Sequence, residues 1–257
     1  MPSQPRFDVT GPHQVIPNDF PDPGIPKVGA DWDAFVLNTD ALASLGPWET
    51  PLGLWAPDFI VRDDGQLALY YSGRPKESPC HHCVVAAIAE GQDPAGPYHP
   101  LKDPFACHMG MGGSIDSAGF LDKGANRWVL YKEDGNSMGN RGCLREQHST
   151  NSSDARPLTE SGSLVLSEEG VYFLFYSSHC WTTPEYDGRY ATSRLVTGPH
   201  VKAAEPLIKS GDNGLKAPGG ATNADDGERV LFHANRPAGR CTYAARLEIL
   251  EQTARIV

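Results

Sequence analysis

The amino-acid sequence predicts an all-β fold, and within that class a five-bladed β-propeller. Gly (27) and Pro (22) are frequent along the whole 257-residue chain, as expected for many short strands joined by turns. Four segments repeat an acidic turn that contains Gly and precedes a strand rich in aromatic and aliphatic residues. These turns recur at roughly 50-residue intervals, the length of a four-stranded blade, whereas a sandwich would show turn signals about every 8–12 residues.

The repeated segments follow one another in order along the chain. The first strand, "WDAFVLNT" at 32–39, comes after its own turn, "VGAD". The four repeats are "VRDDGQLALYYSG" (61–73), "LDKGANRWVLYKEDG" (121–135), "LSEEGVYFLFYSS" (166–178) and "ADDGERVLFHANR" (224–236), with turn glycines at Gly65, Gly124, Gly170 and Gly227. Each repeat is predicted to form a β-hairpin.

One interval of the chain departs from this pattern. The stretch around residues 134–160 is polar and poor in strand-forming residues. Two interpretations stay open for it: a degenerate or shortened blade, or a long surface loop. We expect residues 1–14 to be an N-terminal extension and residues 15–257 to form one propeller domain with the catalytic site.

Charge and hydrophobicity exclude several classes of partner. The net charge of -10 argues against nucleic acid and anionic membranes, because both need clustered Lys and Arg. No run of about 18 apolar residues is present, and the N-terminal sequence lacks the apolar core of a signal peptide. Six cysteines allow three disulfides, and a sequon at Asn151 is in keeping with secretion.

Three acidic residues precede apolar strands and are candidates for a shared site. Asp22 lies between prolines in "NDFPDPGI", Asp116 lies in "GGSIDSAGFLD", and Glu160 lies in "TESGSLVLSEEG". A single such acid is more often a solvated turn residue. Three acids in the same place within successive blades favour a functional role, because the starts of inner strands converge on the central channel.

The order of these landmarks resembles glycoside hydrolase family 43. The motifs that carry the resemblance are "NDFPDPGI", "LWAPDFIVRDDGQLALYYS", "GGSIDSAGFLDKGANRWVLYK", "ESGSLVLSEEGVYFLFYSS" and "VLFHANR", which together extend over about residues 15–250. The resemblance implies a five-bladed propeller that cleaves arabinose- and xylose-containing polysaccharides with inversion.

The resemblance also implies a role for each of the three acids. Asp22 matches the general base, Asp116 matches the residue that tunes and orients the acid, and Glu160 matches the general acid. Inversion needs a base and a protonated acid about 6.5–9.5 Å apart, with room for water between them. A Glu keeps its proton near neutral pH if burial or a second carboxylate raises its pKa. Asp116 suits the role of the second carboxylate, because it has no cationic residue beside it in the sequence.

The sequence around Glu160 departs from the family pattern. Members of the family usually place the acid in a Glu-x-Pro context, whereas this chain has Glu160-Ser161-Gly162. The alternative candidates for the acid are Glu146, Glu168 and Glu169. The last two occupy a turn, where a solvated role is the more common one.

Four further residues are candidates for binding, two of them, His233 and Arg240, through the resemblance. Trp55 is a candidate sugar platform or a core residue, and Asp58 either contacts a hydroxyl group or holds a strand end. Arg240 resembles an arginine that reaches the sugar, although an ordinary surface role is equally common. His233 aligns with a histidine that helps to bind a structural ion, commonly calcium, through water. We expect no required cofactor.

The motif "CHHC" (80–83) contains half of a zinc-site pattern but has no second pair of ligands. Within the resemblance, Cys83 and Cys107 lie on consecutive strands and form a disulfide. Similar segments occur in secreted fungal-type members of the family, so we expect an extracellular protein whose signal peptide is not present in this chain.

These observations lead to one function and several alternatives. We expect an exo-acting glycosidase that releases α-L-arabinofuranose from plant cell-wall polysaccharide. The alternatives are a β-xylosidase, an endo-arabinanase, or a catalytically impaired propeller that binds carbohydrate. The expected partner is a pentose-containing oligosaccharide or polysaccharide, without nucleic acid or membrane, and the expected state is a monomer.

Overall fold

The structure is a computed structural model that describes residues 11–16, 23, 27–28, 31–32, 41–135, 159–224 and 227–257. It confirms the all-β prediction, since every named element is a strand apart from short 3₁₀ turns at Met109–Met111 and Asp212–Gly214. In the part of the chain that is described, no helix is long and apolar enough to cross a membrane.

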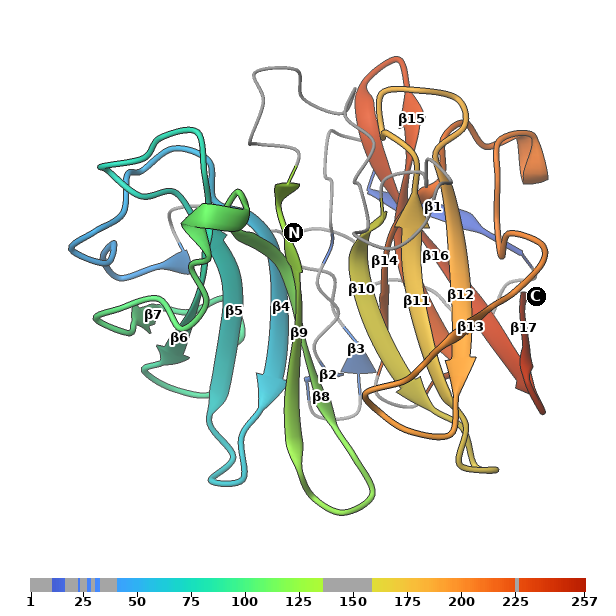
Figure 1. The fold of residues 1–257 in the computed structure, drawn as a ribbon, viewed down its shortest axis with the longest axis horizontal. Coiled ribbons are helices and arrows are strands. Elements are labelled where there is room, and N and C mark those ends of the chain that lie inside the picture. The colour runs from blue at the N-terminus through green and yellow to red at the C-terminus, as the bar shows by residue number, and fades with distance from the viewer. Residues whose placement is uncertain are drawn as a thin grey trace.

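The strands form separate sheets that stand side by side (Figure 1). The first four-stranded sheet consists of β4 (Trp55–Val61), β5 (Leu67–Gly73), β6 (Cys83–Ala89) and β7 (Tyr98–Pro100). The second consists of β10 (Thr159–Leu166), β11 (Tyr172–Ser178), β12 (Asp187–Ser193) and β13 (Val201–Lys202). Two-stranded sheets are formed by β8 (Ser114–Leu121) with β9 (Arg127–Glu133), and by β2 (Lys27–Val28) with β3 (Asp31–Trp32).

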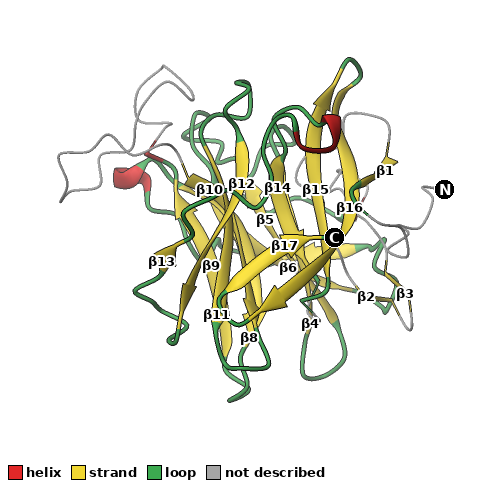
Figure 2. Cartoon of the chain, turned by 90° about the vertical axis from the view of Figure 1, so that its right-hand side faces the viewer, coloured by secondary structure: helices red, strands yellow, loops and turns green. Residues whose placement is uncertain are grey.

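The last sheet joins the two ends of the described chain. It contains β14 (Gly219–Asn223), β15 (Arg229–Arg236), β16 (Gly239–Leu250) and β1 (His13–Ile16), and β17 (Thr253–Ile256) also pairs with β16. Strand β1 runs antiparallel to β16, with His13 opposite Ala244 (Figure 2). An early segment is therefore hydrogen-bonded into the sheet formed by the latest ones.

The four predicted hairpins are β4–β5, β8–β9, β10–β11 and β14–β15, and all four are confirmed. Gly65, Gly170 and Gly227 have the left-handed backbone that favours glycine in a turn, with φ of +71° to +80°. In the β8–β9 turn the left-handed residue is Ala125 rather than the expected Gly124. Asp122 stabilises this turn, because its Oδ1 accepts hydrogen bonds from the amides of Gly124 and Asn126, both at 2.8 Å.

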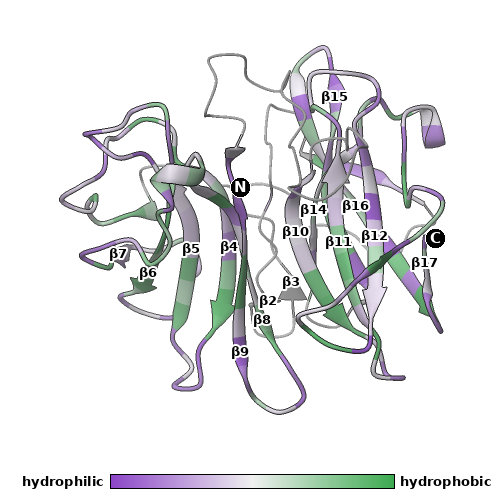
Figure 3. Cartoon of the chain, in the orientation of Figure 1, coloured by the Kyte–Doolittle hydropathy of each residue, from purple (hydrophilic) through white to green (hydrophobic). Residues whose placement is uncertain are grey.

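Hydrophobic side chains pack within and between the sheets. One cluster joins the β10–β13 sheet to the β14–β16 sheet and includes the fully buried Phe173, Phe175 and Phe232. A second cluster packs on the β4–β7 sheet around Leu69 and Tyr98. In Figure 3 the hydrophobic colour is strongest toward the lower ends of β4, β5 and β10 and is paler toward their upper ends. The paler ends are where β4 and β10 begin and where β5, which runs antiparallel to β4, ends.

Parts of the prediction lie outside the described residues. Strands β2 and β3 belong to the region predicted for the first blade, and the rest of the predicted strand at 32–39 is not described. Residues 136–158 also lie outside the described residues, so both interpretations of that interval stay predictions. Four successive sheets, beginning at β4, β8, β10 and β14, are described.

Each of these four inner strands carries a β-bulge at the same place. The register shifts between Trp55 and Asp58, between Ile115 and Ala118, between Glu160 and Ser163, and between Gly219 and Thr222. The first bulge residue is left-handed every time: Ala56, Asp116, Ser161 and Gly220 have φ of +45° to +61°. Three of these four are not glycine, and such backbone outliers occur preferentially at functional sites.

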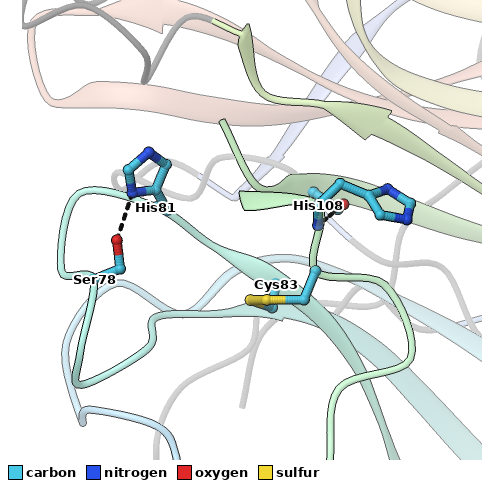
Figure 4. The surroundings of a disulfide bond; sticks show 6 residues. Ser78, His81, Cys83 and His108 are labelled. Atoms are coloured by element: carbon cyan, nitrogen blue, oxygen red, sulfur yellow. Dashed lines mark hydrogen bonds between the residues drawn. A yellow bond between two sulfur atoms is a disulfide. The ribbon is translucent and has the colours of Figure 1, made fainter. Parts of the chain in front are cut away.

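The predicted disulfide between Cys83 and Cys107 is present (Figure 4). It excludes the zinc interpretation of "CHHC", because the sulfur of Cys83 is already bonded. In the same motif, His81 contacts the hydroxyl of Ser78 at 2.7 Å, and Cys80 is an exposed free thiol. Within the described residues, no group of three His, Cys, Asp or Glu side chains has the arrangement of a metal site.

Candidate active site

A narrow cavity of about 30 Å³ lies where the four bulges meet, with space for a water molecule or two. Its described walls come from β4, β8, β10 and β14. The lining residues are Ala56, Pro57, Asp58, Asp116, Ser117, Ala118, Ser161, Gly162, Gly220, Ala221 and Thr222. The small side chains leave this space free, and Asp116 and Asp58 are the two carboxylates in the wall.

Asp116 is held in place from two neighbouring sheets. Its amide donates a hydrogen bond to the Ser72 hydroxyl on β5, at 3.2 Å, and its Oδ2 accepts one from the Ser161 amide on β10, at 3.1 Å. Burial raises the pKa of Asp116, while the charge of Lys132 and the Ser161 hydrogen bond act in the opposite direction. Asp116 therefore lies beside the strand segment that contains Glu160.

Glu160 lies directly before the bulge of β10, opposite Ser177 of β11. Its side chain is 14% exposed, and its Oε2 lies 3.7 Å from the Nζ of Lys132. Asp116 and Glu160 were expected in the same place of successive blades, but Asp116 is the first bulge residue and Glu160 is the residue before the bulge. Glu160 occupies the same position before the bulge of β10 as Trp55 does in β4 and Ile115 in β8.

The alternative acids are less well placed. Glu168 and Glu169 are exposed in the turn between β10 and β11, at the far end of that hairpin from the cavity. Glu146 lies outside the described residues. So does Asp22, the predicted general base, and its role stays a prediction.

Together with Asp134, Lys132 is a residue of this site that the sequence analysis missed. It is close to the end of β9, with its side chain 11% exposed, and its Nζ lies 3.8 Å from Asp134 Oδ1 as well as 3.7 Å from Glu160 Oε2. Asp116 has no cationic residue beside it in the sequence, but the hairpin brings Lys132 opposite Ile115, the residue before Asp116. The sequence did contain a signal for Lys132. In the repeated segments it occupies the position that corresponds to Ser72 and Ser177.

Asp134 belongs to the same group of charges. Burial raises the pKa of Asp134, and the negative charge of Asp116 raises it further, whereas Lys132 and His81 lower it. Three carboxyl groups therefore surround one ammonium group. Such an arrangement can hold a proton on one of the acids at a pH where an isolated carboxyl group is ionised.

Trp55 and Asp58 begin β4 on the neighbouring side of the cavity. Trp55 is 45% exposed and stacks on His82, with ring centroids 3.6 Å apart, so its other face is available for a ligand and a core role is excluded. Asp58 Oδ2 accepts a 2.7 Å hydrogen bond from the Gly119 amide on β8. This contact holds two sheets together, and sugar binding by Asp58 stays a prediction.

His233 and Arg240 lie on β15 and β16, in the sheet that contains β14. His233 is buried with its ring parallel to that of Tyr186, and burial, with a smaller effect from Arg240, lowers the pKa of His233 to about 3. A neutral imidazole suits a ligand role, but the described residues supply no three-ligand cluster around it, and we assign no step to a metal ion. Arg240 stacks on Trp181, with Cζ 4.4 Å from the ring centroid.

The residues described here resemble known proteins in a consistent way. The model of glycosyl hydrolases family 43 matches residues 30–253. A thermostable family-43 glycoside hydrolase has a TM-score of 0.71 and 21% identity, covering 100% of this chain and 96% of its own. The endo-1,4-β-xylanase of Bacteroides thetaiotaomicron has a TM-score of 0.64 and 22% identity, with coverages of 93% and 94%.

A third solved structure extends the range of named activities. The α-L-arabinanase of Cellvibrio cellulosa has a TM-score of 0.67 and 16% identity, covering 93% of this chain and 95% of its own. No curated protein matches the chain. At these identities, likeness to the solved structures establishes the fold alone.

Proposed function

Because this chain belongs to glycosyl hydrolase family 43, we propose that it is an inverting exo-glycosidase that releases α-L-arabinofuranose from arabinose-containing plant cell-wall polysaccharide. The observation that carries the proposal is the hydrogen bond from the Ser161 amide to Asp116 Oδ2. It ties the buried carboxylate of β8 to the strand segment that carries Glu160.

In this proposal Glu160 is the general acid. It donates its proton to the glycosidic oxygen as the bond to the leaving sugar breaks. Lys132 and the Ser161 amide favour the ionised form of Asp116, and its negative charge favours the protonated form of its neighbour. Asp22 is proposed as the base that activates the attacking water from the opposite face of the sugar ring.

Two features of the described residues are in keeping with a sugar site at this place. Small side chains line the cavity between the four bulges and leave space beside Asp116 and Asp58. Trp55, exposed and rigidly stacked on His82, provides a flat apolar surface at the neighbouring position. Arg240 and Asp58 are proposed to contact sugar hydroxyl groups.

The test is a panel of aryl glycosides and natural polymers. We expect p-nitrophenyl α-L-arabinofuranoside to be hydrolysed with a higher kcat/KM than p-nitrophenyl β-D-xylopyranoside, and linear arabinan to yield arabinose from the start of the reaction. Proton NMR of the first product should show the inverted anomer. Preference for the xyloside indicates a β-xylosidase, and early release of arabino-oligosaccharides indicates an endo-arabinanase. Sugar binding without turnover of any substrate would show an impaired propeller.

We also propose that the protein works outside the cell. The Cys83–Cys107 disulfide supports this location, because such bonds persist in oxidising compartments and are rare in reducing ones.

A further inference from the structure

The junctions between successive sheets follow a repeated pattern of hydrogen bonds. At the first junction, Ser72 Oγ accepts from the Asp116 amide and Asp58 from the Gly119 amide. At the junction between β10–β11 and β14, Ser177 Oγ accepts from the Gly220 amide, at 2.7 Å, and Ser163 Oγ from the Asn223 amide, at 3.3 Å. In both cases a serine near the end of the second strand holds the first bulge residue of the next sheet.

The junction between β8–β9 and β10 uses different residues at the same positions. Ser72 pairs with Trp55, Lys132 with Ile115 and Ser177 with Glu160, and each of these pairs directly precedes a bulge. Lys132 therefore stands where the neighbouring sheets have a serine. Ala118, which has no side-chain acceptor, stands where they have Asp58 or Ser163, and the amide of Ser161 donates instead to Asp116 Oδ2.

Among the described residues, acidic groups on three segments lie near the charge of Lys132. These groups are Asp116 on β8, Asp134 directly after β9 and Glu160 on β10, and His81 acts on Asp134 from the β5–β6 connection. A largely buried ammonium group is costly to desolvate unless carboxylates compensate for the lost water. The neighbouring sheets have a serine at the position of Lys132, so the junction between sheets does not require a lysine. The lysine therefore points to an electrostatic role.

We propose that Lys132 is a positioning residue for the acid Glu160: its ammonium group orients the carboxyl group and lowers the pH at which Glu160 loses its proton. The proposal rests on the proposed function, which makes Glu160 the acid. Asp116 and Lys132 then act on Glu160 in opposite directions, and their balance sets the upper end of the working pH range. The charge of Lys132 favours a mildly acidic range.

The test compares the pH dependence of kcat/KM on an arabino-oligosaccharide for wild type, Lys132→Met, Lys132→Arg and Ser177→Ala. Removal of the cation makes ionisation of Glu160 less favourable, so the upper limb of the Lys132→Met profile should move up by about one pH unit. Lys132→Arg keeps the charge and should keep the limb. Ser177→Ala removes an inter-sheet contact at the equivalent position without changing charge, and should also leave the limb in place.

Two results would overturn the role of Lys132. One is a folded Lys132→Met variant whose profile superimposes on that of wild type, and the other is a shift in Lys132→Arg as large as that in Lys132→Met. If Lys132→Met lacks the circular-dichroism spectrum of wild type, Lys132→Gln takes its place, because it keeps a long polar side chain.

A second measurement separates this inference from the proposed function. Carbon-13 NMR titration of the Glu160 carboxyl group, assigned with Glu160→Gln, needs no substrate. If wild type hydrolyses none of the panel, the proposed function fails, yet an upward shift of this titration in Lys132→Met still supports the coupling. An unchanged titration contradicts it whatever the activity.

Discussion

The carboxylate of Asp116 accepts a hydrogen bond from the main-chain amide of Ser161, and both residues have the same left-handed backbone in the bulges of adjacent sheets. The contact aligns the bulge of β8 with that of β10. A carboxylate that is tied to a neighbouring main chain keeps its place while its charge acts on a nearby acid. The first predictions concern these two segments.

Glu160→Gln should affect substrates according to their leaving groups. We expect kcat/KM on an arabino-oligosaccharide to fall by about 10³-fold, and on a dinitrophenyl glycoside by about tenfold or less, because a good leaving group needs little protonation. Steady-state kinetics on both substrates check this. The matched control is Glu168→Gln, in the exposed turn of the same hairpin, which should leave both values unchanged. Equal losses on the two substrates would argue against Glu160 as the acid.

Asp116→Asn should lower kcat/KM on both kinds of substrate by about 10²-fold. Asparagine can still accept the hydrogen bond from Ser161, so the circular-dichroism spectrum should stay that of wild type, and the loss reports the missing charge. Asp122→Asn, at the other end of the β8–β9 hairpin, is the control and should retain activity. An active Asp116→Asn enzyme would remove this residue from the catalytic group.

Ser72→Ala and Ser177→Ala should lower the free energy of unfolding by similar amounts, about 1–2 kcal/mol each. The reason is that each leaves a main-chain amide at a sheet junction without its acceptor. Urea denaturation measures the change. Ser193→Ala, near an exposed turn where its hydroxyl accepts from Leu195, should cost less. A cost as small as that of Ser193→Ala would show that the junction bonds contribute little.

His233 should make the protein sensitive to acid. Burial lowers the pKa of His233 to about 3 in the folded protein, against an ordinary value of 6.5, so below pH 6.5 the unfolded chain takes up a proton that the folded chain does not. Stability is lost as the pH falls from 6.5 toward 3, and His233 accounts for about 2 kcal/mol of that loss by pH 4.5.

Urea denaturation of wild type and His233→Gln between pH 7 and pH 4.5 tests this prediction. The free energy of unfolding should fall less steeply with acidification in the variant, whatever its value at pH 7. Parallel curves for the two proteins would mean that His233 is protonated in the folded state.

The disulfide should contribute to stability through the loop of 24 residues that it closes. Cys83→Ala is expected to lower the free energy of unfolding by about 3 kcal/mol, and non-reducing peptide mapping of wild type should recover a peptide pair joined at Cys83 and Cys107. Cys80→Ala, three residues away at an exposed free thiol, is the control. Recovery of Cys83 and Cys107 as unlinked peptides would contradict the assignment.

The sequence predicted much of the fold because its signals are local. An acidic turn followed by an apolar strand makes a hairpin wherever it occurs, and all four such segments became hairpins. The turn at Gly124 shows the limit of that reasoning. Asp122 already stabilises the turn through main-chain amides, and this allows Ala125 instead of the glycine to take the left-handed backbone.

The candidate site was predicted only in part. Asp116 and Glu160 were found because each precedes an apolar strand in a recognisable motif, and Trp55 because of its own motif. The bulges were missed, since a bulge depends on how two strands pair and leaves no clear pattern of residues. Lys132 was missed because it follows five strand residues and looks, in isolation, like an ordinary exposed lysine.

By itself the sequence determined the strands, their order, the hairpin turns, the acidic candidates and the family, because these depend on local propensity and on motifs along the chain. Only the tertiary structure decided that the amide of Ser161 binds Asp116, that Lys132 lies among Asp116, Asp134 and Glu160, and that a serine holds the next sheet at two other junctions. The physical reason is that strand register and sheet packing bring together groups that are far apart in the chain. The interaction between charges depends on their distance in space and not on their separation in the sequence.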